Sequence, residues 1–497
     1  MLEIRRIVAV MIAMAVAPSA LALAADPARM RTADPPASVA DRNAFALALL
    51  SRLAPASEAG NVVVSPQGVS RVLAMAAEGA SGETAAEIRR AGRLPASARS
   101  LDLIDPARPR SRLGLNVRAV PNDGYGLKVQ EVPAGSPAAK AGLAPGDLIL
   151  TVEDRPVRSL AALRDAVEAA GAGGRPVRTR IYAFGSGKVV EIAIQPEAVS
   201  TPSPYAARDA AFVQRGLAIR PEFRAALDRA FHAPLISLDF ASDPRGAAGE
   251  IVRFATSAGD ATPRPDVSAI DASTRLVLLD AVAFEAEWQH PFPPDSPAPF
   301  TGADGRRTEV PTLRRTGRYA MASSPDGSML AEIPYVDDSF SFVLALPTEG
   351  KSPRALIASL SADAFDSRRR ALKPRRVDLQ LPRFGVASTH RLNAPLAAMG
   401  VTLAFSPRAD FSNLVARQPG DALDRLALGS VVQSAYLKVT PRGTRAGAAT
   451  TAAVVTLDAE AEPVAFHADR PFAFFLVDRR TGLIVFAGVL DDPARPD

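Results

Sequence analysis

The chain has 497 residues, of which 47% are hydrophobic and 22% charged, a composition typical of a folded globular protein. The formal net charge is +5, and the short Arg-rich runs lack interleaved aromatic residues, which argues against a nucleic-acid partner. Because there is no Cys, disulfides, thiol redox chemistry and thiolate metal sites are excluded. The four His residues form no ordered cluster with Asp or Glu, so we expect no metal and no cofactor.

Residues 1–24 predict a secretory signal peptide. Arg5 and Arg6 precede an apolar stretch at residues 7–17, and small residues at 22–24 suit a cleavage site. The apolar stretch is shorter than the roughly 18 residues that a membrane span needs, and no later segment reaches that length. We therefore expect a secreted or periplasmic protein without a membrane span, with a flexible lead-in at residues 25–37.

Residues 38–100 predict a helix, a short strand and two further helices. Apolar residues at helical spacing indicate an amphipathic helix around residues 45–53. A run of three valines at 62–64 predicts a buried strand. Ser65 followed by Pro66 is a helix start signal, because Ser caps the first turn and Pro fits its first position. A turn at residues 79–82 leads to the next helix.

The sequence changes character over residues 101–197. Gly is dense there, short strands are predicted at residues 126–129 and 148–152, and one amphipathic helix at residues 159–169. Roughly 90 residues make a domain-sized unit. We therefore expect an inserted domain between the two parts of a larger one, 38–100 and 198–497.

Long strands return after the insertion. Residues 274–284 are nearly all apolar, as expected for a strand that is covered on both faces. Further strands are predicted at residues 339–346, 377–381, 431–439, 472–475 and 483–489, the last two forming a hairpin.

Four segments outside the insertion, taken in order, resemble signatures of the serpin family of serine protease inhibitors. They are NVVVSP at 61–66, LVLLDAVAFEAEW at 276–288, ADFS at 409–412 and RPFAF at 470–474. The resemblance implies an α+β serpin fold with three β-sheets, about eight to nine helices and an exposed reactive loop. It also implies a suicide inhibitor of serine proteases, with cysteine proteases as an alternative target class, and not an enzyme.

The insertion resembles a PDZ domain of the kind found in bacterial periplasmic serine proteases. The resemblance rests on RLGL at 112–115, AAKAGL at 138–143 and PGDLI at 145–149. It implies a small β-sandwich or barrel whose Gly-permitted turn binds the carboxylate of a peptide C-terminus. The implied carboxylate-binding loop is Leu113, Gly114 and Leu115, and Leu160 and Leu163 line the implied groove. The alternative is a PDZ-like spacer with an empty or blocked groove.

The serpin resemblance places the reactive loop at about residues 443–465. Its hinge is Gly443, Thr444, Arg445, Ala446, Gly447, Ala448, Ala449 and Thr450. Read with a period of two, the even positions of this segment are uncharged and small or β-branched, whereas Arg445 falls on the odd face. An inserted strand can therefore bury its even face without burying an unpaired charge.

Counting from Gly443 as in the family places the scissile bond at Leu457–Asp458. Leu457 suits the apolar primary pocket of chymotrypsin- or subtilisin-like proteases. If Asp458 is the bait residue, the target is an Asp-selective protease, and cleavage after Thr456 or Val455 suits elastase-like proteases. These alternatives stay open at this point.

Four positions depart from the family pattern. Pro441 stands where Glu is usual and removes a backbone N–H near the insertion point. Gln433 and Ser434 stand where His-Lys is common, and Asp280 where Asn is common. Gln433 can still donate and accept hydrogen bonds in a buried network. If insertion is slow, the protein becomes a substrate of the protease.

Two other function classes compete with the inhibitor. The sequence argues against a PDZ-bearing serine protease, because His232, His290, His390 and His467 lie in no protease-like motif and there is no Gly-x-Ser-x-Gly elbow. The open alternative is a non-inhibitory serpin scaffold that acts as a periplasmic PDZ peptide-binding adaptor or chaperone. The expected partners are a target protease at the loop and a peptide or protein C-terminus at the PDZ module, with the chain itself a monomer.

Overall fold

The computed structural model describes residues 37–55, 60–95, 110–113, 115–119, 126–157, 160–171, 175–199, 204–257, 263–336, 339–416, 426–444 and 462–494. The predicted signal peptide and most of the predicted reactive loop lie outside these residues. None of the described helices is long and apolar enough to cross a membrane.

Three helices and a short strand open the described chain: α2 (Ala37–Leu53), β1 (Val62–Val64), α3 (Pro66–Gly79) and α4 (Gly82–Ala91). The start of α3 is as the sequence predicts, because the Ser65 hydroxyl accepts a hydrogen bond of 3.2 Å from the Gly68 N–H and Pro66 lies in the first turn. Nearly all of α3 is buried, including Gln67 and Ser70. This helix therefore lies inside the molecule rather than on its surface.

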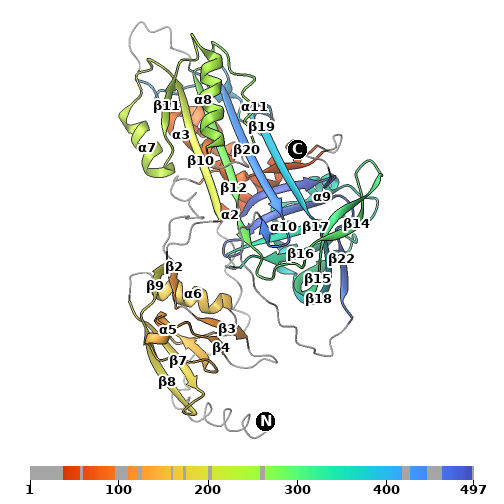
Figure 1. Cartoon of the computed structure of the whole chain (residues 1–497). Helices are drawn as coiled ribbons and strands as arrows, with labels where there is room; N and C mark the ends of the chain where they lie inside the picture. The colour runs from red at the N-terminus through yellow and green to blue at the C-terminus, as the bar shows by residue number, and fades with distance from the viewer. Residues whose placement is uncertain are drawn as a thin grey trace. The chain divides into compact units, whose positions relative to one another are not determined.

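A seven-stranded sheet runs through the centre of the residues outside the insertion (Figure 1). Its strands are β10 (Tyr205–Gln214), β11 (Leu235–Leu238), β12 (Leu276–Phe284), β13 (Ala286–Glu287), β19 (Phe384–Arg391), β20 (Ser430–Val439) and β21 (Gly443–Thr444), in the order β11-β10-β12-β20-β21-β13, with β19 on β20. The predicted two-sided burial of β12 is confirmed, because α3 packs on one face and α8 (Pro244–Thr256) on the other.

Nine strands form the second hydrogen-bonded network. They are β1, β14 (Ser296–Thr301), β15 (Arg307–Ser323), β16 (Met329–Pro334), β17 (Phe340–Leu346), β18 (Lys373–Pro382), β22 (Val464–His467), β23 (Phe472–Asp478) and β24 (Ile484–Leu490). The 17-residue β15 pairs with β14 and β18 along its length and with β16 at its end. Two sheets therefore share β15, and with the seven-stranded sheet they make the three sheets that the serpin resemblance implies.

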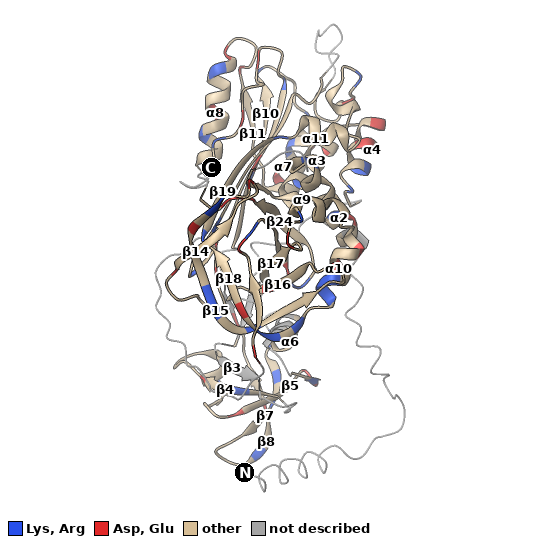
Figure 2. Ribbon diagram, turned by 90° about the vertical axis from the view of Figure 1, so that its right-hand side faces the viewer, with Lys and Arg blue, Asp and Glu red and all other residues tan. Residues whose placement is uncertain are grey.

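Four further helices complete the eight α-helices that the described residues hold outside the insertion: α7 (Pro221–Phe231), α9 (Pro353–Ser359), α10 (Ala362–Arg370) and α11 (Asn393–Ala398). Figure 2 shows α2, α3, α4, α7, α9 and α11 gathered on one side of the sheets. The expected α+β fold class is confirmed.

The insertion is a separate small domain with a hydrophobic core of its own. Its elements are β3 (Asn116–Ala119), β4 (Leu127–Glu131), α5 (Pro137–Lys140), β5 (Leu148–Val152), β6 (Arg155–Pro156), α6 (Leu160–Gly171), β7 (Val177–Ala183) and β8 (Lys188–Ile194). At its two ends β2 (Arg110–Arg112) and β9 (Glu197–Val199) pair antiparallel. The chain therefore enters and leaves the insertion side by side, as in domains that tolerate insertion into a loop.

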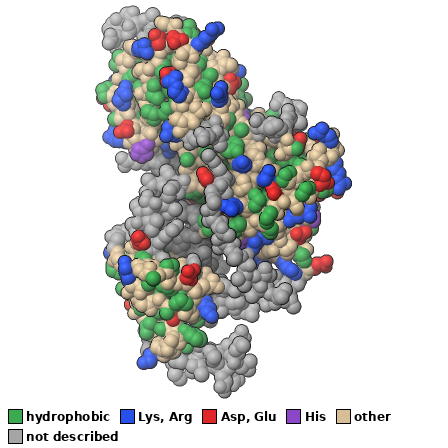
Figure 3. Space-filling view, viewed as in Figure 1, with side chains coloured by type: hydrophobic (Ala, Val, Ile, Leu, Met, Phe, Trp, Pro, Cys, Tyr) green, Lys and Arg blue, Asp and Glu red, His purple; other side chains and the backbone are tan. Residues whose placement is uncertain are grey.

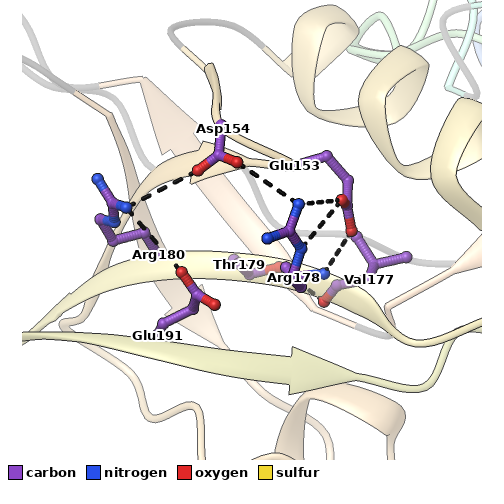
Figure 4. A network of polar contacts seen from close by, with 7 residues as sticks. All are labelled: Glu153, Asp154, Val177, Arg178, Thr179, Arg180 and Glu191. Atoms are coloured by element: carbon purple, nitrogen blue, oxygen red, sulfur yellow. Dashed lines mark hydrogen bonds and ion pairs between the residues drawn. The ribbon is translucent and has the colours of Figure 1, made fainter.

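An exposed network of charged side chains ties a turn of the insertion to its sheet (Figure 4). Glu153 and Asp154 form the turn between β5 and β6, both with positive φ (46° and 62°). Arg178 contacts both carboxylates, at 3.1 and 3.5 Å, and Arg180 lies 3.7 Å from Asp154 and 4.0 Å from Glu191. Because these pairs are exposed, each contributes little to stability.

Candidate functional site

The centre of the seven-stranded sheet is a seam between two parallel strands. β12 and β20 pair from Val277 with Ser430 to Ala283 with Tyr436. Parallel ladders are slightly less stable per residue than antiparallel ones. A strand that entered this seam antiparallel to both neighbours would replace one parallel ladder by two antiparallel ladders.

A tight turn after β20 sends the predicted hinge back toward this seam. The Thr440 N–H donates to the Gly443 carbonyl at 2.8 Å, and the Gly443 N–H donates back at 3.3 Å. Thr444 then pairs with Val439 on one side and Ala286 on the other. The first two hinge residues thus already lie between β20 and β13, the short continuation of β12.

Both of these residues fit their place closely. A Cβ atom at Gly443 would collide with the carbonyl oxygen of Ala286, so only Gly allows this approach. Thr444 is fully buried, and its hydroxyl lies 2.6 Å from the hydroxyl of Tyr335. Tyr335 in turn stacks on Trp288, with ring centroids 4.6 Å apart. The Trp motif and the hinge therefore form one packed unit.

Pro441 lies in the turn and not in a ladder. Its carbonyl accepts a hydrogen bond of 2.7 Å from the Phe292 N–H. The indole N–H of Trp288 donates to the Thr440 carbonyl beside it at 2.9 Å. The missing N–H of Pro441 therefore removes no hydrogen bond from the ladders of β20 and β21, and the expected loss at the insertion point does not occur in these strands.

A buried polar cluster crosses the seam on three adjacent strands. Asp209 on β10 lies opposite Asp280 on β12, which lies opposite Gln433 on β20. The Gln433 amide accepts from the Ser65 N–H at 3.0 Å and donates to the Ser65 carbonyl at 2.8 Å and to Asp280. Asp209 is held by Arg71 at 2.6 Å. Gln433 thus both donates and accepts, as its amide chemistry allows.

The cluster is not fully satisfied. The Oδ1 of Asp280 and the hydroxyl of Ser434 are buried without a hydrogen-bond partner in the described part of the chain. Burial raises the pKa of Asp280 well above its ordinary value, and the neighbouring Asp209 raises it further. Gly68 of α3 lies directly against this carboxyl group, where any Cβ atom would collide. The seam therefore holds two carboxyl groups side by side, of which Asp280 binds its proton more tightly than an exposed Asp does.

The structure brings together only part of the predicted site. Hinge residues Arg445, Ala446, Gly447, Ala448, Ala449 and Thr450, the scissile pair Leu457 and Asp458, Gly114 and the side chain of Leu160 lie outside the described residues.

The described residues of the predicted peptide site are largely packed inside the insertion. The carbonyl of Leu113 accepts from the Ala138 N–H at 2.8 Å, and the Leu113 side chain is buried. Leu115 is partly buried against the same core. Leu163, expected to line a groove, is only 5% exposed and belongs to the core.

Sequence reasoning missed Tyr335, Asp209 and Arg71 as neighbours of the site. Asp209 gave one usable signal, since this acid directly precedes the apolar run at residues 210–213 of β10. Tyr335 gave none, because its contact with Thr444 joins positions 109 residues apart.

The chain turns back from the end of β20 and places Gly443 and Thr444 between β20 and β13, an arrangement of the central sheet that defines a class of protein fold. Comparisons with known proteins agree. The family model described as Serpin (serine protease inhibitor) matches residues 40–111 and 198–493, and a PDZ domain model matches residues 128–182. The chain belongs to the serpin family and carries an inserted PDZ domain.

Curated relatives match about half of this chain. An uncharacterized serpin-like protein of Thermococcus kodakarensis is 31% identical over 59% of this chain and 67% of its own length. Plasminogen activator inhibitor 1 of Neovison vison is 29% identical over 57% of this chain and 71% of its own length. The chain spans 56% of mouse glia-derived nexin, at 34% identity.

Solved structures share the fold at lower identity. Native protease nexin-1 with heparin has a TM-score of 0.62 and 21% identity, covering 92% of this chain and 99% of that one. A thyroxine-binding globulin in complex with thyroxine has a TM-score of 0.63 at 18% identity, covering 93% and 100%. At these identities the likeness shows the fold alone.

Proposed function

We propose that this protein is an exported suicide inhibitor of serine proteases. The observation that carries the proposal is the position of Gly443 and Thr444 between β20 and β13, at the head of the β12–β20 seam. After cleavage, the following residues can continue in the same direction and add a strand. The protease, still acylated, is then dragged along and distorted.

The segment between the hinge turn and the predicted scissile bond is long enough to form an inserted strand. The 13 residues from Arg445 to Leu457 extend to roughly 43 Å as a strand. Cleavage at Leu457–Asp458 would release them, and Leu457 favours a chymotrypsin- or subtilisin-like target. A relative named as an inhibitor of plasminogen activator supports the inhibitor class.

We further propose that the PDZ module binds the C-terminus of a peptide or protein. The loop residue Leu113 is fixed against α5 by its bond to Ala138, which holds the start of the implied carboxylate loop in place. Export, predicted from the N-terminal segment, places both activities outside the cytoplasm.

The decisive experiment mixes the full chain with chymotrypsin and, separately, with subtilisin. We expect an equimolar complex that survives denaturing electrophoresis, together with loss of protease activity. Protease whose catalytic Ser is already blocked with a sulfonyl fluoride is the control and should give no complex. Cleavage between residues 444 and 464 without a complex, and without a rise in Tm of the cleaved chain, would show a non-inhibitory scaffold and favour the adaptor function.

A further inference from the structure

Positive charge is concentrated on β15 and β18. The two strands carry seven Lys or Arg residues against two carboxylates, an excess of five charges that equals the formal net charge of the whole chain. Figure 2 shows Lys and Arg segments along β15, and Figure 3 shows Lys and Arg side chains over the part where β14 and β22 are labelled in Figure 1. The rest of the chain is therefore close to neutral.

The exposed cations meet at one end of this strand pair. Arg318 lies directly opposite Arg376, and both are exposed, as are Lys373 and Arg375. Like charges directly opposite each other destabilise a sheet. The only carboxylate on β18 is Asp378, which accepts from Thr316 at 3.4 Å and contacts His467 at 2.9 Å. Pairing of β15 with β18 thus brings cations of the two strands together at this end.

We call Arg318, Lys373, Arg375 and Arg376 the basic end. Its position relative to the loop is fixed by β22, the first described strand after the loop. β22 runs parallel to β18, with Val464 opposite Val377. Lys373, Arg375 and Arg376 therefore lie beyond the start of β22, on the side from which the chain arrives.

Chain length limits how far a bound protease can be from the basic end. Asp458 is six residues before Val464, so the two are at most about 22 Å apart. A protease domain of roughly 200 residues has a radius of gyration of about 16 Å. A protease that holds the scissile bond in its active site can therefore reach the basic end with its own surface.

We propose that the basic end is a docking site for the target protease, which carries acidic side chains next to its active-site cleft. This inference rests on the proposed inhibitory function. It adds that the inhibitor reacts fastest with proteases that carry acidic side chains next to the active-site cleft. Opposite charges at exposed positions steer encounter and raise the association rate, and the effect falls with ionic strength.

The arrangement of charge favours a globular partner over a linear polyanion. Successive residues of a strand point to opposite faces of a sheet, so Arg375 and Arg376 present charge on both faces at this end. A protease held at the loop can contact charges on both faces at this end of the sheet, whereas a linear polyanion binds along one face.

A matched pair of double variants tests this proposal. Arg375→Glu with Arg376→Glu reverses two charges of the basic end. Arg224→Glu with Arg229→Glu reverses two exposed charges on α7, whose buried side chains belong to a different core from those of β18. Both pairs change the net charge equally. The probes are chymotrypsin and succinylated chymotrypsin, which share an active site and differ in surface charge.

The measured quantity is the second-order rate constant of complex formation, or of loop cleavage if no complex forms. We expect the unmodified chain to react about tenfold faster with succinylated than with native chymotrypsin at about 0.02 M NaCl, and equally fast at about 0.5 M NaCl. The Arg375/Arg376 double variant should lose this difference, whereas the α7 double variant should keep most of it. Equal Tm values establish that both variants fold.

Three outcomes overturn the docking site. The first is a rate difference that survives in the Arg375/Arg376 double variant. The second is an equal loss of the rate difference in both double variants, which is an effect of net charge alone. The third is an Arg375/Arg376 double variant that loses retention on heparin–agarose but keeps the rate difference, which identifies a polyanion site. Absence of any cleavage between residues 444 and 464 overturns the proposed inhibitory function, and the docking site with it.

Discussion

At the scale of single residues, Asp280 is the most unusual feature of the central sheet. It is fully buried between Asp209 and Gln433, and its Oδ1 accepts no hydrogen bond from the described residues. Burial and the charge of Asp209 raise its pKa, while Arg71 acts in the opposite direction. A carboxyl group whose pKa is raised in the folded protein binds its proton more tightly there than in the unfolded chain, so the titration of Asp280 links stability to pH.

The Asp280→Asn variant should therefore be more stable than the natural chain at pH 8, because the amide has no proton to lose and each unit by which the pKa of Asp280 is raised costs the natural chain about 1.4 kcal/mol at that pH. For a carboxyl whose folded pKa is raised, stability falls as pH rises above the unfolded pKa of about 3.9. The advantage of the variant should hence shrink toward pH 4. Urea unfolding at several pH values measures this.

The matched control is Asp209→Asn, which removes the partner of Arg71 and should destabilise the protein at pH 8. An Asp280→Asn difference that stays constant from pH 4 to pH 8 would contradict a raised pKa of Asp280.

At the scale of elements, β21 links the hinge sequence to the sheet. The turn at Thr440 reverses the chain, and Thr444 is buried between β20 and β13. Side chains of a strand alternate between its two faces. If the chain continues as a strand beyond Thr444, Ala446, Ala448 and Thr450 share the buried face of Thr444, and Ala449 lies on the other.

Ala448→Arg and Ala449→Arg form a matched pair of variants that tests which face of the inserted strand is buried. A buried unpaired Arg costs several kcal/mol, so Ala448→Arg should slow insertion and turn most of the inhibitor into cleaved substrate. Ala449→Arg should inhibit nearly as well as the natural chain. The ratio of covalent complex to cleaved chain on denaturing gels measures the partition, and equal ratios for the two variants would refute the face assignment.

At the scale of the whole molecule, two units with separate cores share one chain. The side chains of the insertion pack among themselves, and the core clusters of the serpin part contain none of them. The pairing of β2 with β9 brings the two ends of the insertion together. Removing the insertion therefore leaves a gap that a short linker can close.

A chain in which residues 110–199 are replaced by a short Gly-Ser linker should form the covalent complex at an unchanged rate. The same chain should lose binding of a random peptide pool with free C-termini, measured by fluorescence anisotropy against the full-length protein. The amidated pool is the control, because it lacks the carboxylate that a PDZ loop recognises. Equal binding of both pools by the full-length chain would show that the module is a spacer.

Local chemistry in the sequence determined much of this protein. The Ser65-Pro66 helix start, the two-sided apolar strand at β12 and the terminal hairpin each depend on neighbours within a few residues, so pattern and propensity suffice to predict them. The family resemblance, which rests on ordered motifs, likewise predicted the serpin fold and the PDZ insertion.

Tertiary structure alone decided how distant positions meet. The contact of Thr444 with Tyr335, the alignment of Asp209, Asp280 and Gln433 across three strands, and the approach of Gly68 to Asp280 all depend on strand register. Register and crossover pairing are set by packing of the whole sheet and leave no local signal. The same reason explains Pro441, which reads as a defect in a strand and lies in a turn, and Arg318, which register places opposite Arg376.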